Sequence, residues 1–324
     1  MILIVSNARD ATADFLQMRM TELGVPFLRL NTESLPEIQL HATASAGQLS
    51  GGFTVAQRHI RFVDVNSVYY RRPAMPIVKG EVSPGLRAWI QSEYRRTWGG
   101  LLMALNRPRW INHPLAISGA SYKSEQLVRS QRFGLSVPET LITNDPKQAQ
   151  AFCAKYDWCV IVKPLGHGEI RGANEEADQV VYTNALSREL ENKLSAVANC
   201  PTLFQHRVQK LIDIRVNIIE HECIAVALHS QEQPASRIDC RRNNMAGMRY
   251  SLVELPSALA DTLIKLTRSY DLYFAAIDLA RDTNGIYWFF ELNPAGQWAW
   301  LEQTIGVPLS TALINCLQGE AVRC

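Results

Sequence analysis

A hairpin near the C-terminal end constrains the fold and the chemistry of this chain more than any other stretch. Two strand-like apolar runs flank a polar segment that ends in Asn284-Gly285, a pair that supplies the positive φ values of a tight turn between twisted strands. Asp278 lies in the first run and Glu291 closes the second, so pairing across the hairpin brings the two carboxylates together. Asn293 follows two residues later, on the same side of an extended chain.

These three side chains predict a site for Mg²⁺. Carboxylate and amide oxygens are the ligands that this hard cation prefers, with waters or phosphates completing its shell. Asp278 and Glu291 are embedded among aromatic and aliphatic residues, where unpaired carboxylates are costly to bury unless a cation meets them. The alternative is a solvated hairpin with ordinary surface acids, which Asp278 alone would favour.

The length and composition fit a globular protein of two or three domains. The chain has 324 residues, 47% of them hydrophobic and 20% charged, with a formal net charge of +2. This balance gives no electrostatic reason to expect a nucleic-acid or membrane partner. Seven cysteines are scattered without a Cys-x-x-Cys pair, which favours reduced thiols over disulfides or zinc. No run is long enough to span a membrane and no signal-peptide pattern is present, so we expect a cytoplasmic protein.

The first part of the chain, residues 1–111, predicts a small α/β domain. The expected elements are strands at 2–5, 25–30 and 67–70, a helix over 10–23, a meander over 40–65 that bends at Gly51-Gly52, and an amphipathic helix over 84–105 before Arg107-Pro108. No Gly-x-Gly-x-x-Gly follows the first strand, so a dinucleotide site is not expected. Arg71-Arg72 ends a strand, where an open α/β sheet binds ligands; an anionic ligand and plain surface charge are equally favoured.

Two further units, 112–200 and 201–324, mix helices and strands. The expected helices cover 118–133, 256–269, 309–317 and a stretch starting at Asp145-Pro146; the expected strands cover 137–143, 158–162, 202–204, 212–218 and 224–228. The strand at 158–162 delivers Lys163 to a glycine-rich segment, 166–172. Backbone amides in such a segment suit phosphates, although a plain mobile hairpin explains the glycines equally well.

Residues 202–218 contribute a candidate hinge and a candidate wall of a site. Gln205-His206-Arg207-Val208 follows a strand and is positioned to join two lobes. The strand after it alternates strictly between apolar and polar residues, so Asp213, Arg215 and Asn217 share one polar face.

The order of these residues resembles the ATP-grasp fold, in which two α+β lobes clamp ATP between their sheets. The resemblance covers about residues 112–324 and rests on Lys123, Lys163, the hinge, Asp213, Arg215, and the triplet Asp278, Glu291 and Asn293. It implies ATP and Mg²⁺ as cofactors, with residues 1–111 forming a pre-ATP-grasp domain. It also implies which residues contact the nucleotide. Lys123 and Lys163 would contact the phosphates, and Asp213 would contact the ribose. The adenine would be bound by the backbone of Gln205, His206, Arg207 and Val208. A solvated helix lysine is the plain alternative for Lys123.

A finer resemblance lies in the run from Phe290 to Glu302, which is similar to the corresponding run of the microviridin ligases, the graspetide synthetases. Asp213-Ile214-Arg215-Val216 and Ile238-Asp239-Cys240-Arg241 also resemble motifs of that family. These enzymes phosphorylate an Asp or Glu side chain of a ribosomally made precursor peptide, and a Ser, Thr or Lys side chain of the same peptide displaces the phosphate. The resemblance implies a partner peptide with a leader and a core. Trp298 and Trp300 would either wall a groove for it or belong to the hydrophobic core.

We therefore predict an ATP- and Mg²⁺-dependent ligase that forms ester or amide crosslinks through an acyl phosphate. Arg215 and Arg241 would neutralise the substrate carboxylate and the transferred phosphoryl group. Asp239 would accept a proton from the attacking hydroxyl or amine, or would only pair with Arg241. Two alternatives stay open, which are a related ligase that adds free amino acids to a small molecule or protein tail, and a nucleotide-binding module without chemistry. Whether the chain forms a homodimer is also left open.

Overall fold

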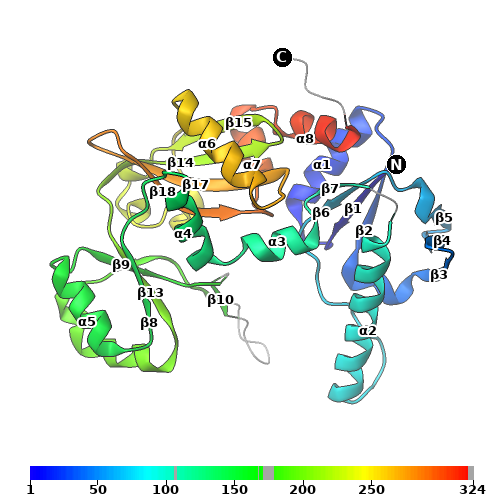
Figure 1. The fold of residues 1–324 in the computed structure, drawn as a ribbon, viewed down its shortest axis with the longest axis horizontal. Helices are drawn as coiled ribbons and strands as arrows, with labels where there is room; N and C mark the ends of the chain where they lie inside the picture. Colours follow the sequence, from blue (N-terminus) through cyan, green and yellow to red (C-terminus); the bar gives the residue numbers. More distant parts are fainter. Residues whose placement is uncertain (106–107, 167, 171–178, 320–324) are drawn as a thin grey trace.

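The computed structural model describes residues 1–105, 108–166, 168–170 and 179–319, and it divides into three parts (Figure 1). An N-terminal α/β domain lies beside a C-terminal lobe, and a smaller central lobe extends below the C-terminal one in this view. No helix of the described ranges is long and apolar enough to cross a membrane. Arg107 and part of the glycine-rich segment, 167 and 171–172, lie outside the described residues.

The N-terminal domain is built on a parallel sheet in the order β2-β1-β6-β7. Its strands are β1 (Ile2–Ser6), β2 (Phe27–Asn31), β6 (Ser67–Tyr70) and β7 (Arg109–Ile111). Helix α1 (Ala11–Glu22) packs on one face, and Asp10 caps it by accepting from Thr12 N. On the other face lie α2 (Pro84–Met103) and an antiparallel sheet of β3 (Gln39–Ser45), β4 (Gln48–Val55) and β5 (Arg58–Arg61), with the short helical turns η1 (Thr32–Glu37) and η2 (Phe62–Asp64).

Gly51 and Gly52 do not form the expected bend, because both lie inside β4, which pairs with a strand on each side. A Cβ on Gly51 would lie 2.3 Å from His41 O, and one on Gly52 would lie 2.1 Å from Ile60 O. The glycines therefore permit close pairing of the strands, and the chain reverses instead at 46–47 and 56–57.

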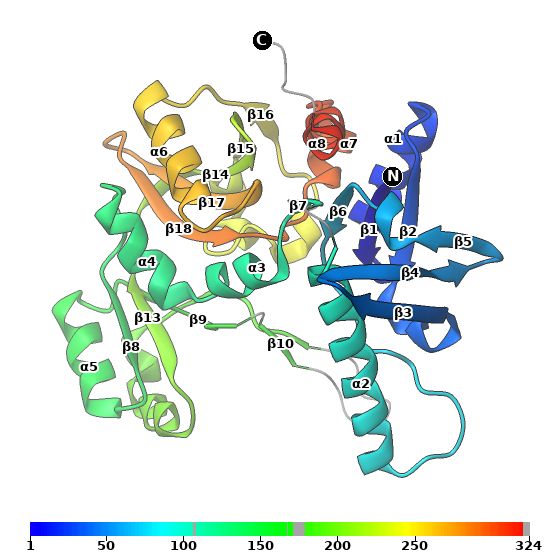
Figure 2. The ribbon, with the colours of Figure 1, turned by 45° about the vertical axis from the view of Figure 1, so that its right-hand side comes forward.

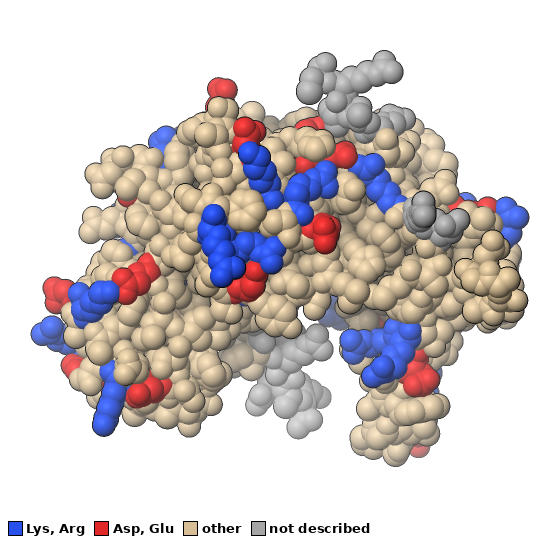
Figure 3. Space-filling model, in the orientation of Figure 1, with Lys and Arg blue, Asp and Glu red and all other residues tan. Residues whose placement is uncertain are grey.

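Helix α2 forms as predicted but buries little of its expected apolar face. Trp98 and Leu102 enter the core, whereas Trp89 is 61% exposed. The first half of α2 extends beyond the domain (Figure 2). On the face that Figure 3 shows, basic and acidic side chains stand in small mixed groups, and no broad field of one sign covers it.

The central lobe carries a four-stranded sheet in the order β12-β9-β13-β8. Its elements are β8 (Thr140–Thr143), α5 (Pro146–Lys155), β9 (Val160–Lys163), β12 (Asn184–Ala185), the 3₁₀ run η3 (Arg188–Asn199) and β13 (Thr202–His206), and the short strands β10 (Glu169–Ile170) and β11 (Gln179–Val180) pair beside it. Asp145 caps α5 as predicted. Strand β13 lies within the unit expected from residue 201 onward, yet it pairs with the central strands, and it continues through Gln205 and His206, which we expected in the hinge.

The helix expected over 118–133 is two helices, α3 (Pro114–Ala120) and α4 (Lys123–Arg132). The chain is extended at Tyr122, and Gln126 Nε2 donates to Ala120 O at 2.6 Å, which satisfies a carbonyl at the end of α3. The break places Lys123 in the first turn of α4, and this helix lies next to the C-terminal lobe (Figure 1).

The C-terminal lobe is a five-stranded antiparallel sheet in the order β16-β15-β14-β17-β18. Its strands are β14 (Lys210–Ile219), β15 (Glu222–Leu228), β16 (Tyr250–Leu252), β17 (Phe274–Asp282) and β18 (Tyr287–Asn293), joined in part by the turns η4 (Ser230–Glu232), η5 (Pro234–Ser236) and η6 (Arg242–Met245). The last two strands are the predicted hairpin. Helix α6 (Ser257–Arg268) covers one face, and α7 (Ala299–Ile305) and α8 (Leu309–Gln318) lie at one end of the other.

The N-terminal domain and the C-terminal lobe share one hydrophobic core. Leu16 of α1 and Leu313 of α8 both belong to it, together with Trp298. Trp298 is fully buried, and its Nε1 donates to Tyr69 Oη at 2.9 Å. Of the two roles left open for this tryptophan, the structure selects the core, so Trp298 does not wall a groove.

Candidate active site

Three strands of the C-terminal sheet place a charged row on one face. Arg215 of β14 pairs in register with Asp278 of β17, which in turn pairs with Glu291 of β18. Arg215 Nε lies 2.8 Å from Asp278 Oδ1. The predicted juxtaposition of the two carboxylates across the hairpin is therefore confirmed, and an arginine adjoins them.

Two lysines from outside this sheet converge on the same row. Lys123 Nζ lies 3.1 Å from Glu291 Oε2 and donates to Pro164 O at 2.9 Å. Lys163, at the end of β9, holds its Nζ 5.6 Å from the centroid of the Phe290 ring. The solvated alternative for Lys123 is thus wrong, because its ammonium faces the carboxylate row and its side chain is only 17% exposed.

The charges of the row shift one another's protonation. Burial raises the pKa of Asp278 to about 6, although Arg215 opposes the shift. Burial also disfavours ionised Glu291, but Lys123 and Lys163 outweigh it and hold the pKa of this carboxyl below its ordinary value. Burial, with a smaller effect of Lys123, lowers the pKa of Lys163 to about 8. Such mutual shifts are typical of functional sites.

The residues present fit Mg²⁺. Asn293 lies two residues from Glu291 on the same face, and its Oδ1 accepts from Ala295 N at 3.0 Å, which leaves one lone pair of that oxygen for a cation. Within the described part of the chain, Asp, Glu, His and Cys nowhere gather in threes. Two carboxylates and one amide form an incomplete all-oxygen set, which suits a cation that keeps waters and phosphate oxygens in its shell.

Asp213 lies on the same face but is already engaged. Lys210 Nζ is 2.8 Å from both of its carboxylate oxygens, and Ser230 Oγ donates to Oδ2. Sequence reasoning missed Lys210, because strict alternation assigns it to the opposite face. An irregularity in the pairing of β14 with β17 between Lys210 and Ile212 brings it round to Asp213.

Asp239 and Arg241 form a bidentate pair. Arg241 Nε and Nη2 lie 2.9 and 2.6 Å from Oδ1 and Oδ2 of Asp239, and Thr183 N donates to Oδ2 at 2.9 Å. Burial opposes ionisation of Asp239, but Arg241 outweighs it and lowers the pKa to about 2. A carboxylate so stabilised is a weak base. This geometry favours the pairing role over the proton-accepting role.

The expected hinge combines buried and stacked side chains. Gln205 is fully buried, its Nε2 donates to Thr140 Oγ1 at 2.8 Å, and its Oε1 has no hydrogen-bond partner among the described residues. The His206 ring stacks on Tyr156 with centroids 4.4 Å apart. Arg207 N donates to Cys159 O at 2.9 Å, and the half-buried Val208 follows. Their contact with adenine stays a prediction.

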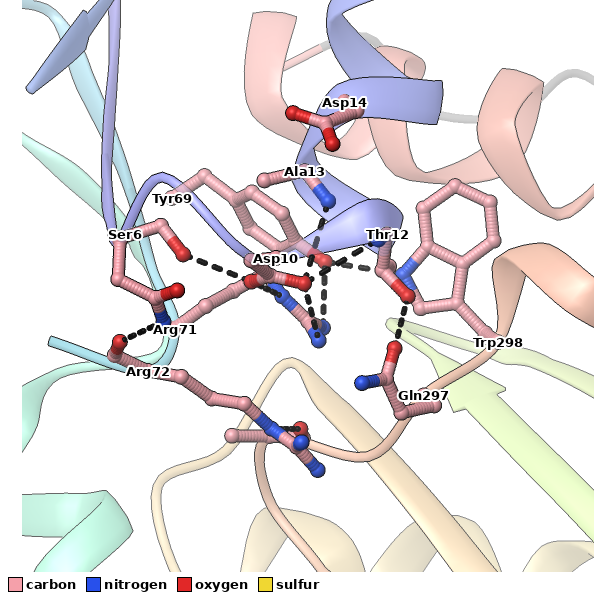
Figure 4. Close-up of polar contacts among 12 residues, drawn as sticks. Ser6, Asp10, Thr12, Ala13, Asp14, Tyr69, Arg71, Arg72, Gln297 and Trp298 are labelled. Carbon is pink, nitrogen blue, oxygen red and sulfur yellow. Dashed lines mark hydrogen bonds and ion pairs between the residues drawn. The ribbon is translucent and has the colours of Figure 1, made fainter. Parts of the chain in front are cut away.

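Arg71 does not face a ligand as one alternative proposed, nor does it sit at the surface. Its Nε lies 2.7 Å from Asp10 Oδ2, and both side chains are almost fully buried (Figure 4). Arg71 Nη1 also donates to Gly296 O at 3.0 Å, and the exposed Arg72 donates to Ala295 O at 3.4 Å. The N-terminal domain thereby reaches the segment that follows Asn293.

Comparison with known proteins places this geometry in a family. The model described as a RimK-like ATP-grasp domain matches residues 120–317, and the model described as an MvdD pre-ATP grasp domain matches residues 1–118. Among curated proteins no relative matches. The expected fold, ATP-grasp lobes preceded by a pre-ATP-grasp domain, is confirmed.

Several solved structures share the fold over nearly the whole chain. The macrocyclase MdnC from Microcystis aeruginosa MRC, bound with precursor peptide MdnA, is 24% identical with a TM-score of 0.87 over 99% of this chain and 100% of that one. A Chryseobacterium gregarium RiPP-associated ATP-grasp ligase with ADP and a leader and core peptide is 24% identical, with a TM-score of 0.89 over 99% and 97%. The ATP-grasp ligase PsnB, complexed with a phosphomimetic minimal precursor, Mg and ADP, is 20% identical, with a TM-score of 0.73 over 98% and 97%.

Proposed function

Because this chain belongs to the RimK-like ATP-grasp family, we propose that it is an ATP- and Mg²⁺-dependent ligase that forms side-chain ester or amide bonds within a ribosomally made precursor peptide. The observation that carries the proposal is the row of Arg215, Asp278 and Glu291 faced by Lys123 and Lys163. The full-length likeness to ligases that bind precursor peptides supports the choice of substrate.

The nucleotide and metal would occupy the space between the two lobes. Asp278, Glu291 and Asn293 would hold Mg²⁺, which supplies charge neutralisation for the transferring phosphoryl group. Lys123 and Lys163 would contact the phosphates, and Asp213 the ribose. The backbone from Gln205 to Val208, which leads from β13 of the central lobe to β14 of the C-terminal lobe, would contact the adenine.

The chain's arginines would handle the substrate carboxylate. That group must approach the anionic γ-phosphate, so Arg215 and Arg241 reduce the repulsion between two anions, and their planar forks match carboxylate and phosphoryl oxygens. The carboxylate attacks phosphorus and ADP leaves. A hydroxyl or amine of the same peptide then attacks the acyl phosphate, phosphate leaves, and one proton is released. Asp239 would orient Arg241, which leaves the proton acceptor open.

Incubation of a precursor peptide with the enzyme, ATP and Mg²⁺ is expected to remove whole waters from its mass. When the carboxylate and the nucleophile belong to one peptide, each ring that forms removes one water from the peptide and adds no mass. The nucleophile is also present at a high effective concentration, which speeds its attack on the acyl phosphate. Mass spectrometry before and after hydroxide treatment checks this. A loss of water that hydroxide treatment reverses indicates esters, and a loss of water that resists hydroxide indicates amides. A mass gain that depends on an added amino acid would overturn the peptide-crosslinking proposal.

Lys163→Met is expected to raise the KM for ATP about ten- to hundredfold while changing the KM for the peptide little. A charge-assisted hydrogen bond to phosphate contributes about 1.5–3 kcal/mol, which corresponds to that range. Separate titration of ATP and peptide measures the two constants. An effect confined to the peptide would contradict the assignment of Lys163 to the phosphates.

The same residue predicts a pH dependence of nucleotide binding. Burial lowers the pKa of Lys163 to about 8, so its ammonium is largely charged at pH 7 and largely neutral at pH 9. Bound phosphate favours the charged form, and ATP affinity should therefore fall as the pH rises through 8. Isothermal titration from pH 7 to 9.5 should show this fall in the unaltered chain and a flatter profile in Lys163→Met. Equal slopes in both would exclude Lys163 as the titrating group.

A further inference from the structure

Three buried side chains hold the backbone around Asn293 at regular intervals. Gln126 Nε2 donates to Leu292 O at 2.8 Å, Asn112 Nδ2 to Pro294 O at 2.8 Å, and Arg71 Nη1 to Gly296 O at 3.0 Å. The donors are 3%, 1% and 3% exposed. They come from α4 and from the residues that follow β7 and β6, so chain segments far apart in sequence bind every second carbonyl of a segment that runs from the end of β18 through the turn at 294–295.

Each donor is itself fixed by further partners. Gln126 Oε1 accepts from Leu292 N at 2.9 Å, so this side chain satisfies both backbone groups of one residue. Asn112 Oδ1 accepts from Tyr273 N at 2.8 Å, which ties the same amide to the start of β17. Arg71 is held by Asp10, the residue that caps α1 (Figure 4). A side chain with two buried partners cannot shift without breaking one of them.

The contacts lie where β18 would otherwise be free to move. Strand β18 is the outer strand of its sheet, and among the described residues no strand pairs with its open edge beside Leu292. Glu291 and Asn293 flank Leu292 in β18, so their side chains point to the opposite side of the strand from that of Leu292. The chain then turns at 294–295, and Gly296 N donates to Asn293 O at 3.3 Å. A Cβ on Gly296 would lie 2.3 Å from Ala276 Cβ, so the segment also packs closely against β17.

We infer that Gln126, Asn112 and Arg71 are positioning residues that set the placement of Glu291 and Asn293 for the metal. The inference rests on the proposed function of the triplet. Its consequence is that the N-terminal domain, through Arg71 and Asp10, supports a metal site that it does not itself form. Groups that orient ligands in this way typically contribute about ten- to hundredfold to metal affinity or activity.

The test compares ADP affinity with and without Mg²⁺, by isothermal titration on the full-length chain. Gln126→Met keeps the length of the side chain but removes both bonds to Leu292. Arg71→Lys keeps a charge beside Asp10, but one ammonium lacks the fork that serves Asp10 and Gly296 O together. Both variants should bind ADP normally without Mg²⁺ and lose about ten- to hundredfold of the Mg²⁺-dependent gain. In a turnover assay with ATP and peptide, excess Mg²⁺ should restore much of the rate at which these variants produce ADP.

Ser67→Ala is the matched control, because it also removes a buried bond between the N-terminal domain and the C-terminal lobe, from Ser67 Oγ to Leu317 O at 2.7 Å. It should leave the Mg²⁺-dependent gain unchanged. Thermal unfolding of each variant shows which proteins are folded, and Arg71→Lys keeps the test decisive if Gln126→Met does not fold.

Two results would overturn the inference. In the first, both variants match Ser67→Ala; in the second, they lose ADP affinity equally with and without Mg²⁺, as a merely structural role would produce. Glu291→Gln separates this failure from that of the metal site. If it retains the full Mg²⁺ gain, the metal assignment is wrong, whereas if it loses the gain while Gln126→Met and Arg71→Lys retain it, only the positioning inference is wrong.

Discussion

Glu291→Gln is expected to lower the rate of ADP release at least about a hundredfold while the fold remains intact. A metal ion on the transferring phosphoryl group contributes several kcal/mol to the transition state, and every 1.4 kcal/mol is a factor of ten. Glutamine keeps the shape of the side chain, so no cavity forms. The loss should fall on turnover at saturating ATP and peptide, which a coupled assay of ADP release measures.

The same change at Glu222 provides the control. Glu222 starts β15 in the same sheet and is half-buried, and burial raises its pKa, but it lies at the far end of the sheet from the carboxylate row. Glu222→Gln should therefore release ADP at the normal rate. Both variants replace a partly buried glutamate of the same sheet by glutamine, so a loss of turnover in Glu291→Gln alone cannot come from a general loss of folding. Near-normal turnover of Glu291→Gln would contradict the metal assignment.

The alternation of polar residues and the turn residues of the sequence predicted the charged row, because its members lie on adjacent strands. The alternation of β14 and the hairpin of β17 and β18 bring Arg215, Asp278 and Glu291 near one another, but an irregularity between Asp278 and Leu279, which the pattern did not predict, skips Phe290 and sets Glu291 opposite Asp278. Even there the turn differs in detail. Gly285 has a φ of +82°, whereas Asn284 does not have a positive φ, and Asp282 Oδ1 accepts from Asn284 N and Ile286 N at 2.9 Å each. The carboxylate closes the turn that the Asn-Gly pair alone was expected to form.

Contacts between distant segments could not be predicted from the same patterns. Arg71 follows its strand as a surface arginine would, and only the packing of α1 against β6 reveals Asp10 as its partner. Gln126 is one polar residue on a polar helix, yet it bonds to a backbone 166 residues away. Gly51 and Gly52 look like a bend until the neighbouring strands are present. In each case the residue's role depends on what the rest of the chain places beside it.

Arg215→Met is expected to reduce the rate of peptide crosslinking at saturating substrates about a hundred- to a thousandfold. A preorganised group that stabilises charge developing in the transition state has an effect of this order. Arg215 is suited to that role, because its side chain is 17% exposed and lies in the sheet between Asp278 and the apolar Val226. The measurement is the rate of water loss from the peptide by mass spectrometry, with ATP and peptide varied separately.

The pattern of the loss distinguishes what Arg215 does. A group that stabilises the transition state lowers kcat and kcat/KM together, whereas one that only binds the peptide raises KM and leaves kcat unchanged. Arg215→Lys should recover part of the rate, because it restores the charge beside Asp278 without the planar fork. Arg61→Met, which breaks the exposed pair of Arg61 with Asp64 in the N-terminal domain, should change neither constant. A rise in the peptide KM alone would reduce Arg215 to a binding residue and would leave Arg241 as the arginine nearer the reaction.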